Sequence, residues 1–264
     1  MAPPLTYAAY LKVEDLLALQ APRSGGDQPA EHDELLFIVI HQVYELWFKQ
    51  LLHELDYAAL RLREGDTARV GHTLRRVLTI LKTVVAQVDV LETMTPLEFS
   101  AFRDHLDSAS GFQSAQFREI EFLLGHKREN MLRHLANEPA SHARLAARHE
   151  APTVWDAFLH YLSLCGHPVP KAQLQRDVRE PIHPSDELQA VLVAVYRHDS
   201  TARNICERLV DMDEGFQEWR YRHVKMVERT IGVKLGTGGS SGAAYLATTL
   251  KPLFPDLWAI RSQL

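Results

Sequence analysis

Cysteines and long apolar runs are scarce in this chain of 264 residues, and neither positive nor negative charge strongly predominates. Its two cysteines, Cys165 and Cys206, form no CxxC pair, which argues against a disulfide framework or a zinc ribbon. The run LLFIVI is too short to span a bilayer, and the first ten residues lack the pattern of a secretory signal. With a formal net charge of -5 and no long basic run, we expect a cytoplasmic protein without a nucleic-acid or membrane-binding surface.

Patterns typical of β-strands are also missing, because no run combines β-branched alternation with Asn-Gly or Asp-Gly turns. Apolar residues instead recur every three or four positions over 33–62 and 69–94, which predicts two long helices. A third is expected over about 201–231. The sequence therefore predicts an all-α fold, a multi-helix bundle in a single domain over 1–264, with a small helical insertion at about 125–181.

Short polar motifs predict where several helices begin and end. Thr95 and Glu98 form a capping-box pattern around Pro96, and Thr153 repeats the pattern with Asp156. Ser185 is expected to be the N-cap of another helix. Gly232 is expected to end the last long helix. A further helix is expected to begin near Phe112 or Gln113.

His41 lies in FIVIHQVYELWF, where helical spacing puts it on one face with Phe37, Glu45 and Phe48. One interpretation is a core histidine that has a hydrogen-bond partner. The other is an imidazole that projects into an aromatic pocket. The spacing alone leaves both open.

His223 belongs to a stripe at steps of three and four along the last long helix: Leu209, Met212, Phe216, Trp219, His223, Met226 and Thr230. Core packing explains every other residue of the stripe, but a neutral imidazole in an apolar slot is also the usual protein ligand of haem iron. Two other metal sites are disfavoured: the single Glu-x-x-His, at Glu180, contains a proline, and CxxCH is absent.

Two polar segments carry further candidate residues. Arg103 precedes the small-residue turn SASG and either binds a carboxylate or pairs with Asp104 or Asp107 at the surface. The stretch KLGTGGSSGAAYL, beginning at Lys234, lacks the Gly-Lys-Ser/Thr of a P-loop. Its glycines and hydroxyls fit a loop that orders over a polar ligand better than a linker, because an apolar helix-like segment follows it.

Three segments in this order, HDELLFIVIHQVYELWFKQLLHEL, ETMTPLEFSAFRDHLDSASGFQSAQFREIEFLLG and WRYRHVKMVERTIGVKLGTGGSSGAAYL, together with FPDLW, resemble the tryptophan 2,3-dioxygenase family. The resemblance runs from YAAYL to FPDLW, and ASGFQS and GTGGSSG are its most specific motifs. It implies a helical, usually homotetrameric enzyme with haem b, ferrous when active. Such an enzyme converts L-tryptophan and O2 to N-formyl-L-kynurenine, the first step of tryptophan catabolism.

The resemblance also implies residue roles. His223 resembles the axial ligand of the haem iron, Ser110 and Gly111 would lie at the haem edge, and His41 would be the catalytic residue that meets the indole N–H. Arg103 resembles the clamp on the substrate carboxylate. The full set of substrate-binding residues would be Phe37, Ile38, Val39, Ile40, His41, Phe99, Arg103 and Thr237, with Tyr7, Tyr10 and Leu11 supplied to a neighbouring subunit by an N-terminal arm over about 1–31.

Two departures from the family pattern stand out. Phe99 occupies a place where other members carry tyrosine or phenylalanine, so a hydroxyl on the substrate carboxylate is absent here. The insertion RSGGD, from Arg23 to Asp27, lengthens the connection after the arm. The rival function is a non-catalytic helical haem sensor or carrier, which would need His223 and an apolar slot but not Arg103 or the Ser/Thr-rich loop.

Overall fold

The computed structural model describes residues 4–27, 29–107, 109–232, 234 and 243–264, and in these residues helices and connecting segments occur but no strand. The all-α prediction is therefore confirmed for the described chain. The α-helices are α1 (Tyr7–Leu11), α2 (Val13–Leu17), α3 (His32–Arg63), α4 (Thr67–Leu91), α5 (Pro96–Arg103), α6 (Ala115–Leu123), α7 (Asn130–His134), α8 (Pro139–Glu150), α9 (Val154–Leu164), α10 (Lys171–Leu174), α11 (Asp186–His198), α12 (Ser200–Ile231), α13 (Ala243–Ala247) and α14 (Pro255–Ala259). Short 3-10 turns are η1 (Asp104–Leu106), η2 (Gly111–Gln113) and η3 (Ile260–Gln263).

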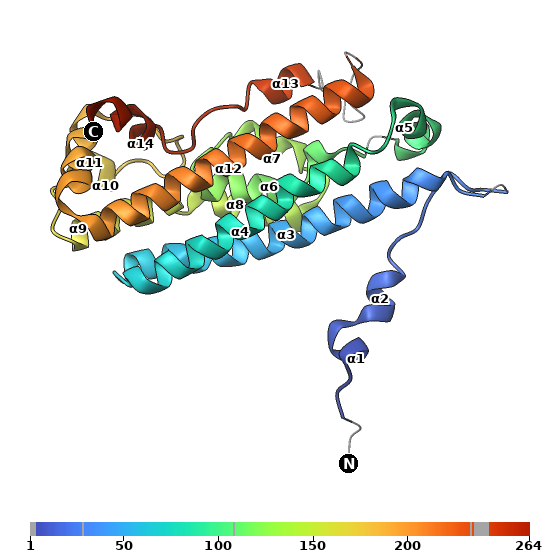
Figure 1. Ribbon diagram of the computed structural model, residues 1–264, viewed down its shortest axis with the longest axis horizontal. Helices are drawn as coiled ribbons and strands as arrows, with labels where there is room; N and C mark the ends of the chain where they lie inside the picture. Colours follow the sequence, from blue (N-terminus) through green and yellow to red (C-terminus); the bar gives the residue numbers. More distant parts are fainter. Residues whose placement is uncertain (1–3, 28, 108, 233, 235–242) are drawn as a thin grey trace.

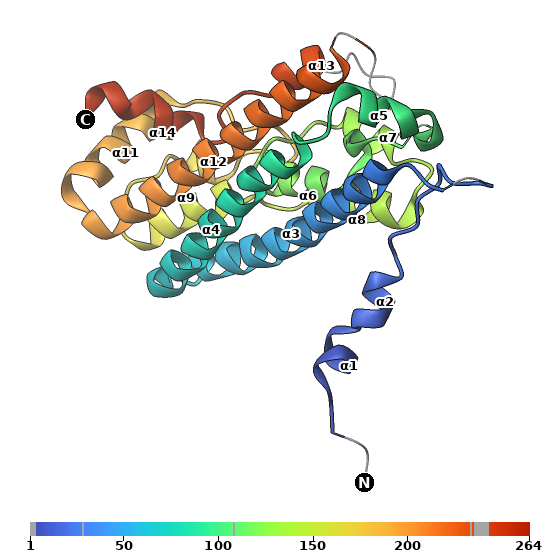
Figure 2. The same cartoon turned by 45° about the vertical axis from the view of Figure 1, so that its right-hand side comes forward.

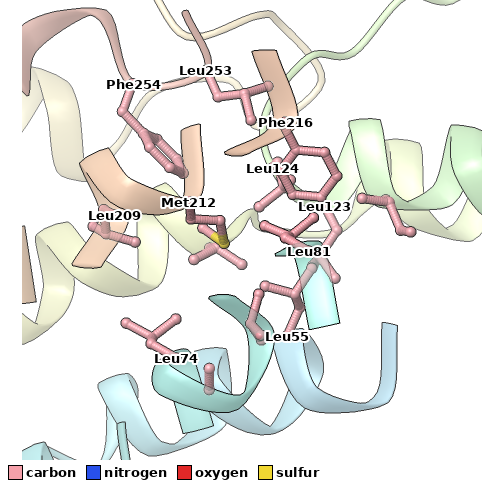
Figure 3. Close-up of a cluster of buried hydrophobic side chains, with 14 of the residues drawn as sticks. Leu55, Leu74, Leu81, Leu123, Leu124, Leu209, Met212, Phe216, Leu253 and Phe254 are labelled. Carbon is pink, nitrogen blue, oxygen red and sulfur yellow. The ribbon is translucent and has the colours of Figure 1, made fainter. Parts of the chain in front are cut away.

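Three long helices, α3, α4 and α12, run side by side and form the body of the molecule (Figures 1 and 2). Helix α4 packs against both α3 and α12, while α3 also contacts α6 and α9. The side chains between them come from segments distant in sequence, as Figure 3 shows for Leu55 of α3, Leu81 of α4 and Phe216 of α12. Each of the three is almost entirely shielded from solvent. Burial of such apolar stripes accounts for the close packing of the three helices.

The expected helix boundaries are confirmed where local side chains decide them. Thr95 and Thr153 each accept a hydrogen bond from the backbone N–H three residues on, and the acidic side chains of Glu98 and Asp156 complete both capping boxes. Gly232 ends α12 at φ 60°, a conformation that favours glycine. The helix expected near 112 or 113 instead begins at Ala115, because Ser114 is its N-cap and a 3-10 turn precedes it.

The C-terminal segment is fastened to α12 by one buried carboxylate. Asp213 Oδ2 accepts hydrogen bonds from the backbone N–H groups of Leu253 and Phe254 and from Trp258 Nε1, at 2.8, 3.0 and 2.9 Å. Asp213 has no solvent exposure. The motif FPDLW is therefore held in place by a group forty residues earlier in the chain.

Two further parts add to the three long helices. Helices α7 and α8 pack beside α6 around their own small cluster of Phe122, Met131, Leu135 and Leu145; they fall within the range 125–181 that the sequence suggested as an insertion. The N-terminal segment with α1 and α2 extends away from the helices and buries none of the residues of α1 or α2 (Figure 1). Glu34 anchors its base by accepting bonds from the N–H groups of Arg23 and Ser24 and from the Ser24 hydroxyl.

Among the described helices, α3 has the length and composition that could cross a membrane. Here it packs against α4, α6 and α9, as a core helix of a bundle does. Its outer face keeps several exposed apolar side chains, including Leu35, Leu46 and Leu60.

Candidate functional site

A cavity of about 510 Å³ lies among α3, α5, α6 and α12. This is the end of the long helices where α5 and α13 also lie (Figure 2). Its walls are mainly apolar and aromatic, with polar groups at a few points. Such a volume and lining are typical of sites for a small molecule or a prosthetic group.

His41 projects from α3 into this cavity together with Phe37, one helical turn earlier. The rings of the two residues are 4.1 Å apart, and Nδ1 of His41 lies 2.7 Å from the carbonyl oxygen of Phe37. A carbonyl oxygen only accepts, so Nδ1 carries the proton and Nε2 of the neutral ring is an acceptor. Burial lowers the pKa of His41, against opposing effects of the Phe37 carbonyl and Glu45. Both open interpretations of His41 thus hold in part: it has a backbone partner and also lines a pocket.

His223 reaches the same cavity from α12. Its ring stacks on Trp219, with centroids 5.3 Å apart and planes within 9° of each other. Burial lowers the pKa of His223 to about 4, and the nearby His41 and Arg118 side chains lower it further. The imidazole is therefore neutral near pH 7, the protonation state that ligates a metal.

Helix α5 and the turn after it form another wall. Phe99 and Phe102 pack around Phe37, with ring centroids 5.9 and 5.5 Å from it, and Arg103 at the end of α5 also lines the cavity. Ser110 and Gly111 follow on the same side. One cavity therefore contains the residues that the sequence suggested for three roles. Phe99 was expected at an aromatic pocket, Arg103 at a carboxylate, and Ser110 with Gly111 at a cofactor edge.

The inner wall contains charged groups that the sequence reasoning missed. Arg118 and Glu121 of α6 and Arg220 of α12 all line the cavity although each is almost fully buried. The segment FREIEF could have indicated buried charges, because its charged residues interrupt an apolar helical segment whose faces must pack against neighbours. Glu45, another lining residue, accepts from Gln116 Nε2 at 2.8 Å.

Several predicted site residues lie elsewhere. Ile38, Val39 and Ile40 share the run with His41 but do not line this cavity; Ile40 is packed in the core and Val39 is exposed. Tyr7, Tyr10 and Leu11 lie on the N-terminal segment, away from the cavity of their own chain (Figure 1), and are 78%, 71% and 45% exposed. Thr237 lies outside the described residues.

The donor set of the cavity limits what kind of metal could bind. In the described parts of the chain, no group of three or more His, Cys, Asp or Glu side chains is arranged to hold an ion. The cavity instead suits a flat prosthetic group that itself supplies most of the ligands of its metal. It offers such a group a neutral imidazole, a stacked indole and apolar walls. His223 is the residue that could supply the remaining ligand.

Comparisons with known proteins give a consistent result. A family model described as tryptophan 2,3-dioxygenase matches residues 2–163 and 161–264. A protein of that name from Herpetosiphon aurantiacus is 65% identical over 264 residues, covering 100% of both chains. Those from an Anaeromyxobacter species and from Xanthomonas campestris are 57% and 43% identical, covering 98% of this chain and 96% and 87% of their own.

Proposed function

The chain belongs to the tryptophan 2,3-dioxygenase family, and from that premise we propose that it oxidises L-tryptophan with O2 to N-formyl-L-kynurenine, with haem b bound in the cavity. The observation that carries the proposal is that His41, Arg103 and His223, from three separate helices, line one largely apolar cavity. Nothing in helix packing alone requires these three residue types to meet.

His223 would hold the haem iron, with Trp219 fixing the orientation of its ring. Ser110 and Gly111 would lie at the haem edge, and the apolar side chains around Phe48 and Phe117 would cover its faces. When bound as ferrous haem, the group would supply the activation of O2. The protein's part is to bind and orient the substrate and to exclude water.

His41 and Phe37 would bind the indole. Because Nδ1 is committed to the Phe37 carbonyl, Nε2 would accept a hydrogen bond from the indole N–H. The aromatic side chains of Phe37, Phe99 and Phe102 would surround the ring. His41 would orient the substrate in this arrangement, and it need not remove the indole proton.

Arg103 would bind the substrate carboxylate, and Thr237 would contact its ammonium and carboxylate end. A guanidinium in a desolvated pocket favours a carboxylate strongly, on the order of 2–4 kcal/mol. Phe99 provides no hydroxyl for this carboxylate, so Arg103 would carry more of its binding here than in relatives with a tyrosine.

Tyr7, Tyr10 and Leu11 would complete the cavity of a neighbouring subunit in a cytoplasmic homotetramer. Their exposure on a segment that leaves the body supports this role, since such apolar groups bury surface only against a partner (Figure 1). In this proposal residues 1–264 form a single domain, residues 1–31 are the arm, and 125–181 a helical insertion.

A non-catalytic haem sensor or carrier is the second candidate. It would explain His223 and the apolar walls. It would not explain why Arg103 and the acceptor nitrogen of His41 face the same space, and this favours the enzyme.

The test is to load the protein with haem, reduce it without oxygen, and add L-tryptophan followed by 18O2. Mass spectrometry should show a product that has gained two labelled oxygen atoms. Intact tryptophan beside a normal haem spectrum would instead establish the sensor or carrier. His223→Ala should lose the haem spectrum while His41→Ala keeps it; a normal haem content in His223→Ala would refute the axial assignment.

A further inference from the structure

A buried carboxylate fixes the segment that connects α2 to α3. Glu34, in the first turn of α3 and 2% exposed, accepts hydrogen bonds from the backbone N–H groups of Arg23 and Ser24, at 2.8 and 2.9 Å, and from the Ser24 hydroxyl. The same hydroxyl accepts from the backbone N–H of Glu31 at 2.8 Å, so Ser24 also satisfies a donor at the start of α3. Burial raises the pKa of Glu34, but the hydrogen bonds from Ser24 and Arg23 outweigh this effect and lower the pKa overall. Hydrogen bonds to an ionised carboxylate are among the stronger ones in proteins, so this end of the segment is held firmly.

A second set of contacts holds the same segment further along α3. Gln42 Nε2 donates to the carbonyl oxygen of Leu19 at 3.0 Å, and its Oε1 accepts from Gln20 Nε2. Gln20 Nε2 also donates to the carbonyl oxygen of Leu16 at 3.0 Å, which connects this end of the segment to α2. Because the earlier residues of the segment meet the later position on α3, residues 19–24 (the strap) run antiparallel to α3. The strap is held at both ends, so the place at which α2 leaves the body is defined.

The chain before and at the start of the strap displays an unusual amount of apolar surface (Figure 1). Its large apolar side chains that are at least 40% exposed are Leu5, Tyr7, Tyr10, Leu11, Leu16, Leu17 and Leu19. Apolar surface on this scale fits burial against another chain. A segment that is already aligned loses less conformational freedom on docking than a free tail does. The strap therefore presents this part of the arm in a defined direction before any partner binds.

We propose that Glu34 and Gln42 are positioning residues for the cavity of a neighbouring subunit: by holding the strap, they set the direction in which the arm carries Tyr7 and Tyr10 to that cavity. The inference rests on the proposed function of the arm, and it goes further because it names the residues that aim the arm. It also gives the insertion at residues 23–27 a role, since the first two residues of the insertion are those that Glu34 binds.

Glu34→Gln tests the inference, because an amide has a single acceptor oxygen for donors that now reach two oxygens. In the haem-loaded protein kcat/KM for L-tryptophan should fall about 10-fold, the change expected when hydrogen bonds to a charged group are lost. The haem spectrum should stay that of the wild type. The matched control is Glu31→Gln, which changes an exposed glutamate three residues earlier and should keep wild-type kinetics. Unchanged kinetics in Glu34→Gln would overturn the inference and leave the dioxygenase function standing, whereas a wild type that forms no product would overturn both.

Mixed oligomers separate the aiming of the arm from an effect of Glu34 on its own cavity. Glu34→Gln is co-expressed with His41→Ala, each with a different affinity tag, and the oligomers that carry both tags are isolated. In them the correctly held arm of a His41→Ala subunit can enter the intact cavity of a Glu34→Gln subunit. The value of kcat/KM per Glu34→Gln subunit should therefore rise several-fold above that of the Glu34→Gln oligomer alone.

The other outcomes of this experiment count against the proposal. No rise in the mixed oligomers would show that Glu34 acts within its own subunit, and the absence of oligomers with both tags would leave the arm without a partner. Gln42→Ala should lower kcat/KM in the same direction and should be rescued in the same mixture. If Glu34→Gln does not fold, Ser24→Ala takes its place, because it removes only the hydroxyl that donates to Glu34.

Discussion

Nδ1 of His41 donates a hydrogen bond to the carbonyl oxygen of Phe37, 2.7 Å away and one turn earlier on α3. A neutral histidine has one protonated nitrogen, so this bond leaves Nε2 as an acceptor toward the cavity. The tautomer of the neutral His41 ring is therefore decided by the backbone of its own helix. This relationship makes the role of His41 testable.

His41→Ala should lower kcat/KM for L-tryptophan by about 10- to 100-fold, roughly 1.5–3 kcal/mol for a lost hydrogen bond. The cause is the loss of the acceptor for the indole N–H. Steady-state kinetics with L-tryptophan and 1-methyl-L-tryptophan measures it: the variant should discriminate less between them than the wild type does. Lys49→Ala, on the exposed side of α3, is the control. Undiminished discrimination in His41→Ala would show that His41 does not contact the indole nitrogen.

Arg103→Ala should lower kcat/KM for L-tryptophan by on the order of 30- to 1000-fold, because the substrate carboxylate loses the guanidinium that would bind it. Tryptamine has the same ring and no carboxylate, so its slower oxidation should change little. Comparing the two substrates in both proteins separates the clamp from general damage to the cavity. An equal fall for both substrates would mean that Arg103 supports the fold of α5 and not the carboxylate.

Asp213→Ala should lower the free energy of unfolding by about 3 kcal/mol or more. It leaves the N–H groups of Leu253 and Phe254 and the indole of Trp258 buried without an acceptor. Urea denaturation of the apoprotein measures the change. Asp211→Ala, two residues earlier and exposed, should stay within about 0.5 kcal/mol of the wild type. Similar losses in the two variants would argue against a specific clamp on the C-terminal segment.

The apoprotein should lose stability as the pH falls from about 6.5 to about 4, in part through His126. Burial lowers the pKa of His126 to about 4 in the folded chain, with Arg220 adding to the effect and Glu121 opposing it. The unfolded chain therefore binds the proton first, and protonation favours unfolding across this window. His126→Gln should remove up to about 3 kcal/mol of the pH-dependent loss.

Thermal melts of the apoprotein at pH 4.5, 5.5 and 7 measure this difference. His160→Gln, which removes an exposed histidine of α9, should follow the wild-type profile. A His126→Gln profile parallel to the wild type would place the acid sensitivity in other groups.

Helix boundaries followed from the sequence where the deciding interactions are local. The caps at Thr95 and Thr153 each need only a residue three positions away, and the stop at Gly232 needs only its own backbone freedom. The start of α6 was placed two or three residues early, because Ser114 and the turn before it compete with the apolar pattern that suggested 112 or 113.

By itself, the sequence determined the helical class, the long helices and the shared helix face of Phe37 and His41, since these depend on contacts within one turn or a few residues. Only the tertiary structure decided which face of the run around Ile38, Val39 and Ile40 meets the cavity. It alone brought Arg220 to Glu121, 99 residues apart in the chain. Such pairs depend on how α4, α6 and α12 pack, and packing is a property of all the side chains together that no local pattern records.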